Sequence, residues 1–171
     1  MGKYSLSFDT AESAQDIRSL EDFLLCNRGS YNQAIYEQWL AETCIPSIER
    51  GDRRALVWKE AGKVVGDAII VPEATDHAVL KNFRVAPQEW LQGRGMGDFL
   101  MRQAIKEAVD LSAETGHISR DANALTLRLD TTLGNPVQTF FERHGFIAVE
   151  YQELYEPGVT EVIMEKIVEL V

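Results

Sequence analysis

The segment that decides the fold reads FRVAPQEWLQGRGMG over residues 83–97. The segment begins with the last residues of a predicted strand, which Pro87 ends. It is followed by apolar residues at the spacing of an amphipathic helix. The turn at 92–97 has glycine at every second position, so its backbone can approach a ligand with no Cβ in the way. Because the first turn of a helix carries unbonded N–H groups and a partial positive charge, the turn is a site for an anion such as a pyrophosphate.

The charge distribution agrees with an anionic ligand there. The 171-residue chain has a formal net charge of -10, yet residues 78–106 are net positive. That stretch has five basic side chains against Glu89 and Asp98, namely Lys81, Arg84, Arg94, Arg102 and Lys106. The acidic total argues against a nucleic-acid partner, which needs Lys and Arg on its phosphates. It suits solubility, or a cationic small molecule.

Hydrophobic periodicity predicts one mixed α/β domain over 1–171, in the order β-α-α-β-β-β-α-β-α-β-β. Helices are expected after Ser13 and Ser30, each of which starts a capping box, and after Gly97 and Asn135. In the second helix Ile35 and Trp39 are expected to share a face, with a stop or kink at Pro46. Strands are expected at 4–8, 55–59, 64–71 (ended by Pro72), 77–85, 125–129, 146–155 and 159–168.

Other phosphate-binding loops fit the turn less well. A Walker loop ends in Gly-Lys-Ser/Thr, whereas Gly97 is followed by Asp98 and Phe99. A dinucleotide fingerprint follows the first strand of a βαβ unit, whereas these glycines follow the fourth predicted strand. The cysteines, Cys26 and Cys44, and the three histidines lack metal-ligand spacing, so no metal is expected, and both thiols are expected to be buried and free.

The chain resembles the GCN5-related N-acetyltransferase (GNAT) superfamily. The pyrophosphate turn of that family, Gln/Arg-x-x-Gly-x-Gly/Ala, is matched by Gln92, Gly95 and Gly97. Its preceding strand, apolar-x-Val-x-Pro, is matched by Phe83, Val85 and Pro87, and its later Asn…aromatic-x-x-x-Gly-Phe segment by Asn135, Phe141, Gly145 and Phe146. The resemblance implies a mixed, mostly antiparallel sheet of about seven strands flanked by about four helices.

The resemblance also implies acetyl-coenzyme A as cofactor and transfer of its acetyl group to a primary amine. The pyrophosphate would bind the backbone of the turn, and backbone groups of the fourth strand would pair with the pantetheine arm like an added strand. The Asn135 side chain would hydrogen-bond that arm. The cofactor-binding residues expected on this basis are Phe83, Arg84, Val85, Gln92, Gly93, Arg94, Gly95, Met96, Gly97, Asn135 and Phe141.

Two departures from the family pattern bear on function. Four residues (88–91) separate Pro87 from Gln92, where the family usually has two. Many members also have tyrosine at the position of Phe141, where it protonates the leaving thiolate, and phenylalanine has no proton to donate. Another group would have to supply the proton, or the chain has lost catalysis.

The sequence leaves the catalytic residues open. Asp76 is taken as a candidate general base and Tyr151 as a candidate acid, and each is also explained as an ordinary surface or packing residue. Glu73, His77 and Asp130 are further candidates for the base, and Tyr155 for the acid.

Three functions stay open at this point. The first is an N-acetyltransferase acting on a small or cationic amine by direct attack, and the second is a non-catalytic acetyl-coenzyme A sensor that regulates a partner protein. The third, a toxin that acetylates aminoacyl-tRNA, conflicts with the net charge. The sequence shows no signal peptide or membrane-length apolar run, so a cytoplasmic protein is expected, and the resemblance implies a homodimer.

Overall fold

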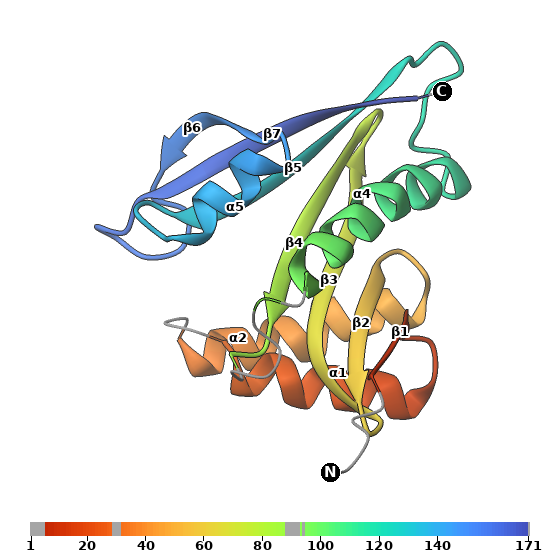
Figure 1. Cartoon of the computed structure of the whole chain (residues 1–171), viewed down its shortest axis with the longest axis vertical. Helices are drawn as coiled ribbons and strands as arrows, with labels where there is room; N and C mark the ends of the chain where they lie inside the picture. The colour runs from red at the N-terminus through yellow and green to blue at the C-terminus, as the bar shows by residue number, and fades with distance from the viewer. Residues whose placement is uncertain (1–5, 29–31, 88–92, 94, 171) are drawn as a thin grey trace. The chain divides into compact units, whose positions relative to one another are not determined.

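The computed structural model describes residues 6–28, 32–87, 93 and 95–170. Thirteen elements follow one another along these residues (Figure 1). The first half contains β1 (Leu6–Thr10), α1 (Ala14–Cys26), α2 (Gln33–Trp39), the π-helix η1 (Leu40–Cys44), α3 (Ile45–Glu49), β2 (Arg54–Glu60), β3 (Lys63–Ala74) and β4 (His77–Val85). The second half contains α4 (Met96–Glu114), β5 (Ala124–Thr132), α5 (Val137–Arg143), β6 (Ile147–Gln152) and β7 (Glu161–Glu169).

The strands form a seven-stranded sheet in the order β1-β2-β3-β4-β5-β7-β6. The ladders β1–β2, β2–β3, β5–β7 and β6–β7 are antiparallel, whereas β4 and β5 run parallel. The predicted mixed α/β fold and its element order are therefore confirmed, with the second predicted helix divided into α2, η1 and α3.

The chain divides into two compact units. Unit 1 comprises Met1–Ile70 and Asn82–Ala104, and unit 2 comprises Val71–Lys81 and Ile105–Val171. The long β3–β4 hairpin and helix α4 each contribute residues to both units, and each unit has buried apolar residues of its own.

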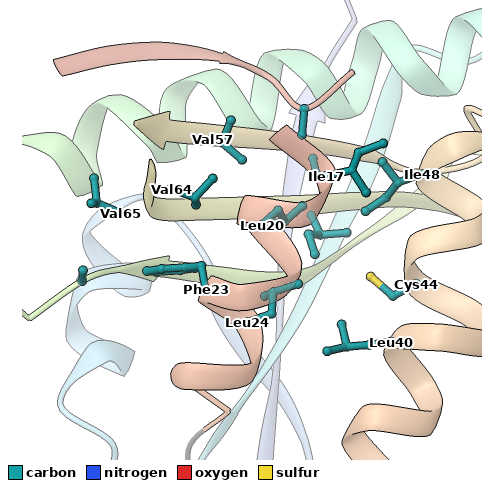
Figure 2. Close-up of a cluster of buried hydrophobic side chains, with 14 of the residues drawn as sticks. Ile17, Leu20, Phe23, Leu24, Leu40, Cys44, Ile48, Val57, Val64 and Val65 are labelled. Carbon is teal, nitrogen blue, oxygen red and sulfur yellow. The ribbon is translucent and has the colours of Figure 1, made fainter. Parts of the chain in front are cut away.

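The core of unit 1 lies between its strands and the helices α1–α3 (Figure 2). Side chains alternate between the two faces of a strand, so Val57 and Lys59 of β2 point to the face that α1 covers. Val57 is fully buried there with Leu20 and Leu24 of α1, and Lys59 contacts Asp16 of the same helix. Burying apolar side chains of this size stabilises the fold by about 1.5–3 kcal/mol each.

Aromatic rings fill the opposite face of the same strands. Trp58 of β2 lies 5.2 Å from Phe8 of β1 and 5.4 Å from Phe99 of α4, between ring centroids. Phe8 and Phe99 meet edge to face at 5.0 Å. Because these spacings suit the ring quadrupoles, the cluster fixes the first turns of α4 against β1 and β2.

Unit 2 has a core on one face of β5. Leu125, Leu127 and Leu129 are buried, as the alternation in the sequence predicts, and Phe146 and Met164 are buried in the same unit. The intervening residues of β5 point to the other face, where Arg128 and Asp130 are partly exposed and Thr132 is exposed.

Some local predictions were wrong. Strand β3 continues through Pro72 to Ala74, with Pro72 buried in it, and turns only at Thr75. The buried residues of the second helical segment include Tyr36 of α2 and Leu40 of η1, whereas Ile35 is 70% exposed. Of the two cysteines, Cys44 is buried and Cys26 is exposed.

The helix boundaries explain two further differences. The side chain of Asn32 caps α2 by accepting a hydrogen bond from the Ile35 N–H at 3.3 Å, whereas Ser30, the predicted cap, lies outside the described residues. The expected break at Pro46 takes the form of η1. Proline has no N–H and its ring presses on the carbonyl four residues earlier, and the wider turn of a π-helix relieves that crowding.

A carboxyl group is buried at the centre of unit 1. Asp67 of β3 is fully buried and accepts a hydrogen bond from the Asn82 amide at 2.5 Å. Its Oδ1 and the Nη1 of Arg84 have no hydrogen-bond partner among the described residues. Burial raises the pKa of Asp67 from 3.8 to about 7, against the opposing effects of the Asn82 hydrogen bond and the Arg84 charge.

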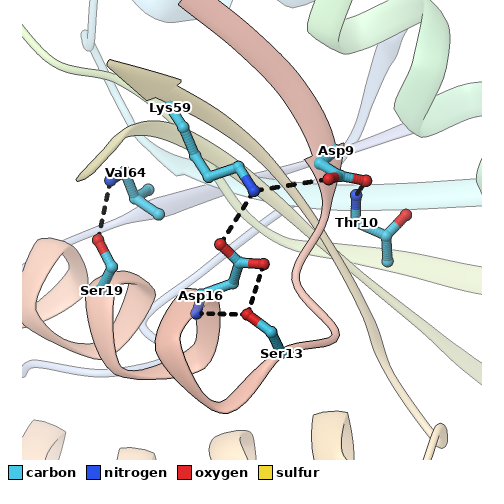
Figure 3. A network of polar contacts seen from close by, with 7 residues as sticks. All are labelled: Asp9, Thr10, Ser13, Asp16, Ser19, Lys59 and Val64. Carbon is cyan, nitrogen blue, oxygen red and sulfur yellow. Dashed lines mark hydrogen bonds and ion pairs between the residues drawn. The ribbon is translucent and has the colours of Figure 1, made fainter. Parts of the chain in front are cut away.

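A polar network joins α1 to the strands of unit 1 (Figure 3). The Ser13 hydroxyl accepts from the Asp16 N–H at 3.0 Å and donates to its carboxylate at 2.8 Å, which is the predicted N-cap. Lys59 donates to Asp16 at 2.9 Å and lies 3.5 Å from Asp9 of β1. Ser19 accepts from the Val64 N–H at 2.9 Å. The start of α1 is therefore tied to β1, β2 and β3.

The buried carboxyl predicts a pH-dependent stability. Between pH 3.8 and about 7 the folded protein keeps the proton of Asp67 while the unfolded chain loses it. The stabilising contribution is thus complete below pH 3.8 and is lost as the pH rises to about 7. We expect Asp67→Asn, which has no charge to bury, to lose less unfolding free energy over that range in urea titrations. The exposed Asp22→Asn should follow the parent, and identical slopes for all three proteins would contradict the prediction.

The N-cap of α1 gives a second prediction. Ser13→Ala removes a hydrogen-bond acceptor from the first turn, so we expect the free energy of unfolding to fall by about 1 kcal/mol. Ser7→Ala, a matched change at an exposed position on β1, should have a smaller effect in the same denaturant titration. Equal losses in the two variants would show that the cap contributes nothing of its own.

Candidate functional site

The glycine-rich turn after β4 has the backbone that a ligand-binding loop requires. Gly93 and Gly95 both have a φ of +70°, in the left-handed region where side chains are strained. A Cβ built on either glycine would meet no atom of the described residues within 4 Å, so these residues leave the space beside this backbone open. Gln92 and Arg94, which were also predicted to bind the cofactor, lie outside the described residues.

Helix α4 begins directly at this turn. In its first turn the Phe99 N–H donates a backbone hydrogen bond to the Gly95 carbonyl at 2.9 Å. The N–H groups of Met96 and Gly97 precede that bond and so have no acceptor within the helix. Met96 is 5% exposed and packs into the core of unit 1, which anchors the helix start. With the N-terminal end of the helix dipole, these N–H groups favour a negatively charged ligand.

Strand β4 leads into the turn through the predicted pantetheine-binding residues, Phe83, Arg84 and Val85. The Ala86 N–H donates to the Val65 carbonyl at 2.8 Å, so this end of β4 is held against β3. The approach is close, because a Cβ on Gly66 would lie 3.0 Å from the Arg84 carbonyl oxygen. The Arg84 side chain belongs to the buried group around Asp67, so any contact of this residue with the cofactor would use its backbone.

In unit 2, Asn135 lies at the start of α5 in the position that the sequence predicted. Its Oδ1 accepts a hydrogen bond from the Val137 N–H at 3.1 Å. The carbonyl end of the side chain therefore serves the helix, while the residue itself is exposed. The Nδ2 donor is the part of the amide that could reach a ligand.

Phe141 lies inside α5 and is 4% exposed. Its ring packs edge to face with Phe140 at 5.7 Å and with Phe146 at 6.1 Å, between centroids. The Gly145 that follows α5 has a φ of +84°, as expected for the residue after a helix end. In this protein the position of the family tyrosine is part of an aromatic core.

The two catalytic candidates singled out in the sequence have different surroundings. Asp76 lies in the β3–β4 turn with a φ of +59°. Its carboxylate accepts hydrogen bonds from the Ser119 N–H at 2.8 Å and hydroxyl at 2.7 Å, and these lower its pKa. A carboxylate stabilised in this way is a weak base. Tyr151 lies on the edge strand β6 and is 58% exposed.

The structure instead brings together Asp130 and Tyr155, which are far apart in the sequence. The Tyr155 hydroxyl donates to Asp130 Oδ2 at 3.1 Å. Glu161 lies nearby on β7, 4% exposed, and accepts from the Thr132 hydroxyl at 3.3 Å. Both hydrogen bonds depend on how β5, β7 and the β6–β7 connection lie beside one another, which sequence patterns do not specify.

Sequence reasoning missed Asp67, a carboxyl whose pKa burial raises to about 7. The signal was an acidic residue within the apolar run 64–71. No group of three or more His, Cys, Asp or Glu residues among those described could hold a metal ion. None of the described helices is long and apolar enough to cross a membrane.

Comparison with known structures identifies the same fold in several acetyltransferases. A protein assigned to the GNAT acetyltransferase family from Desulfovibrio desulfuricans is 18% identical, with a TM-score of 0.68 over 96% of this chain and 99% of that chain. The ribosomal-protein-S18-alanine N-acetyltransferase from Escherichia coli is 18% identical, with a TM-score of 0.65 over 98% and 96%. The PaiA N-acetyltransferase from Thermoplasma acidophilum, solved in complex with coenzyme A, is 19% identical, with a TM-score of 0.62 over 95% and 98%.

At these identities the structural likeness concerns the fold alone. A search of curated proteins finds no match. The family model described as "Acetyltransferase (GNAT) domain" matches residues 51–148, which run from β2 to the start of β6 and include the glycine-rich turn, Asn135 and Phe141. The chain therefore belongs to the GNAT acetyltransferase family.

Proposed function

We propose that the protein is an N-acetyltransferase that binds acetyl-coenzyme A and transfers the acetyl group to a primary amine of a small or cationic acceptor. The observation that carries this proposal is the turn in which Gly93 and Gly95 both take left-handed backbone, directly before the open start of α4. That arrangement provides backbone N–H donors and room for a pyrophosphate. Coenzyme A in the Thermoplasma acidophilum relative supports the same ligand.

The residues present fit the cofactor in each unit taken separately. In unit 1 the backbone of residues 83–85 and 93–97 would hold the pantetheine and pyrophosphate groups, and Gln92 and Arg94 would add to the turn. In unit 2 the Nδ2 of Asn135 would donate to the pantetheine arm. The bound cofactor would supply an activated thioester, and a backbone N–H near Val85 would polarise its carbonyl.

The acceptor follows from charge and chemistry. The chain has a formal net charge of -10, so it would attract a cationic amine. Amide formation needs the amine in its neutral form, so the enzyme must remove a proton from the ammonium before attack. A cytoplasmic location and a homodimer remain predictions from the sequence and the family.

A sensor that binds acetyl-coenzyme A without turning it over is the alternative, and one observation favours it. Phe141 occupies the place of the family tyrosine and has no proton to donate. Thiol release from acetyl-coenzyme A with a panel of diamines, polyamines, amino sugars and peptides separates the two functions. Release with any amine identifies an enzyme, whereas binding without release with every amine identifies a sensor.

The turn gives a direct test of cofactor binding. Gly95→Glu places a side chain and a negative charge where the pyrophosphate would lie, so we expect calorimetry to detect no acetyl-coenzyme A binding. Gly51→Glu is the matched control, because Gly51 also has left-handed backbone, with a φ of +80° and open space around it. Both variants should remain folded by circular dichroism. The proposal fails if the parent does not bind, or if Gly95→Glu binds as well as Gly51→Glu does.

Asn135 allows its two roles to be separated. Asn135→Ser keeps a side-chain oxygen that can cap α5, but the shorter hydroxyl does not replace the Nδ2 donor. We expect it to weaken acetyl-coenzyme A binding roughly five- to tenfold, as for one lost hydrogen bond, with little change in thermal stability. Asn135→Ala should lower both affinity and stability. Unchanged affinity in both variants would leave Asn135 with the capping role alone.

A further inference from the structure

Trp58 of β2 lies in a row of neighbouring residues that crosses the sheet to the end of β4. Gly66 of β3 is its direct partner in the β2–β3 ladder, and a Cβ built on Gly66 would lie 3.6 Å from the Trp58 Cβ. Toward β4, the same Cβ would lie 3.5 Å from the Val85 Cα and 3.0 Å from the Arg84 carbonyl oxygen. A glycine inside a strand marks a place where another backbone comes close. Trp58 is therefore separated from the close contact between β3 and β4 by one residue without a side chain.

The Trp58 ring also contacts the first turn of α4. Its centroid lies 5.4 Å from that of Phe99, with an angle of 55° between the ring planes. The Phe99 N–H donates to the Gly95 carbonyl, so this contact lies within one helical turn of the glycine-rich turn. Trp58 therefore reaches both backbone segments that would hold the cofactor in unit 1, the start of α4 through Phe99 and the end of β4 through Gly66.

Phe8 of β1 completes this aromatic cluster. Its ring lies 5.2 Å from Trp58 at 61° and 5.0 Å from Phe99 at 84°, so each of the three rings contacts the other two. The Trp58 Nε1 is buried and has no hydrogen-bond partner among the described residues, so packing orients the ring. Because packed interiors leave few voids, the size of the Trp58 ring determines how closely the start of α4 approaches β2.

We propose that Trp58 is a positioning residue for acetyl-coenzyme A, and that it sets the separation between the start of α4 and the end of β4. The proposal rests on the function proposed above, in which the start of α4 holds the pyrophosphate and the end of β4 holds the pantetheine. Trp58 touches neither part of the ligand and acts through Phe99 and Gly66. These residues all belong to unit 1, so the separation is determined within one compact unit.

The separation matters because one molecule would bridge the two subsites. Once the pantetheine is bound, the pyrophosphate meets its own subsite at a high effective concentration, provided that the spacing of the ligand matches that of the protein. The donor–acceptor distances of good N–H···O hydrogen bonds span only about 0.5 Å, so a small shift of the helix start breaks the match. A smaller side chain at position 58 lets the start of α4 move toward β2, and the ligand then satisfies one subsite but not both.

The test compares Trp58→Leu with Trp39→Leu, its matched control. Trp39 is also a partly buried tryptophan of unit 1, but its ring packs on Tyr36 of α2, at 5.4 Å between centroids. By calorimetry we expect Trp58→Leu to bind acetyl-coenzyme A more weakly than the parent by about tenfold or more, and Trp39→Leu to bind as the parent does. Trp58→Phe, which keeps an aromatic ring, should recover most of the lost affinity. Circular dichroism at the assay temperature checks that each variant is folded.

Phe99 allows the route of the effect to be checked. If Trp58 acts through the start of α4, Phe99→Leu should also weaken acetyl-coenzyme A binding. The variant that carries both substitutions should then bind no more weakly than the weaker of the two single variants. Full additivity of the two losses would mean that Trp58 acts independently of Phe99, which contradicts the proposal.

A shorter ligand separates positioning from a general loosening of unit 1. S-acetylpantetheine lacks the pyrophosphate, so of the two segments it needs only the end of β4. We expect its affinity, measured by ligand-observed NMR, to be the same in Trp58→Leu and in the parent. Phe99→Leu answers the same question if Trp58→Leu does not fold.

Three results would overturn the role of Trp58. They are parental acetyl-coenzyme A affinity in Trp58→Leu, an equal loss in Trp39→Leu, and a loss of S-acetylpantetheine affinity by the same factor as for acetyl-coenzyme A. In each of these the proposed function is unaffected, because the parent still binds acetyl-coenzyme A. A parent that does not bind acetyl-coenzyme A overturns both proposals.

Discussion

The burial of β3 is the constraint on which unit 1 depends. From Val64 to Ile70 every residue of this strand is buried, so both of its faces and both of its edges must be covered. Helix α1 covers one face through apolar contacts and through the Lys59–Asp16 ion pair, and β2 and β4 cover the edges. The turn that would bind the cofactor follows the strand that pairs with β3. Its position is therefore fixed by a core to which, among the described residues of the turn, only Met96 belongs.

Much of this fold was predictable from the sequence because the signals are local. Alternation of leucines over 125–129 predicted β5, and β4 was placed correctly at His77–Val85. The failures arise where tertiary context overrides a local preference. Pro72 was expected to end a strand, yet β3 continues past it for two residues. Of the two cysteines expected to be buried, only Cys44 is, and Cys26 is exposed.

The candidate site was also only partly predictable from the sequence. Its backbone parts could be predicted, because glycine at alternate positions before a helix has few explanations other than close approach of a ligand. The side-chain chemistry could not be predicted to the same degree. Asp130 and Tyr155 were only two among several candidates until strand register and the path of the β6–β7 connection brought them within hydrogen-bonding distance. Asp67 was missed because its importance comes from burial between neighbouring strands, which a single strand pattern does not reveal.

The π-helix η1 has a consequence for the phase of the helical segment that follows β1 and α1. The buried residues Tyr36, Leu40, Cys44 and Ile48 recur every four positions. In a regular α-helix of about 3.6 residues per turn, four-residue steps advance by about 40° each, so Ile48 would be rotated about 120° from Tyr36. Each residue of the wider η1 turn adds less rotation than a residue of an α-helix, which offsets part of the 120° and keeps the four side chains on one side. A single-residue deletion within residues 40–44 would leave eleven steps between Tyr36 and Ile48, which in a regular α-helix is a rotation of only about 20°. The π-helix therefore accommodates one extra residue while the buried side stays the same, and such a deletion should leave Ile48 facing the core.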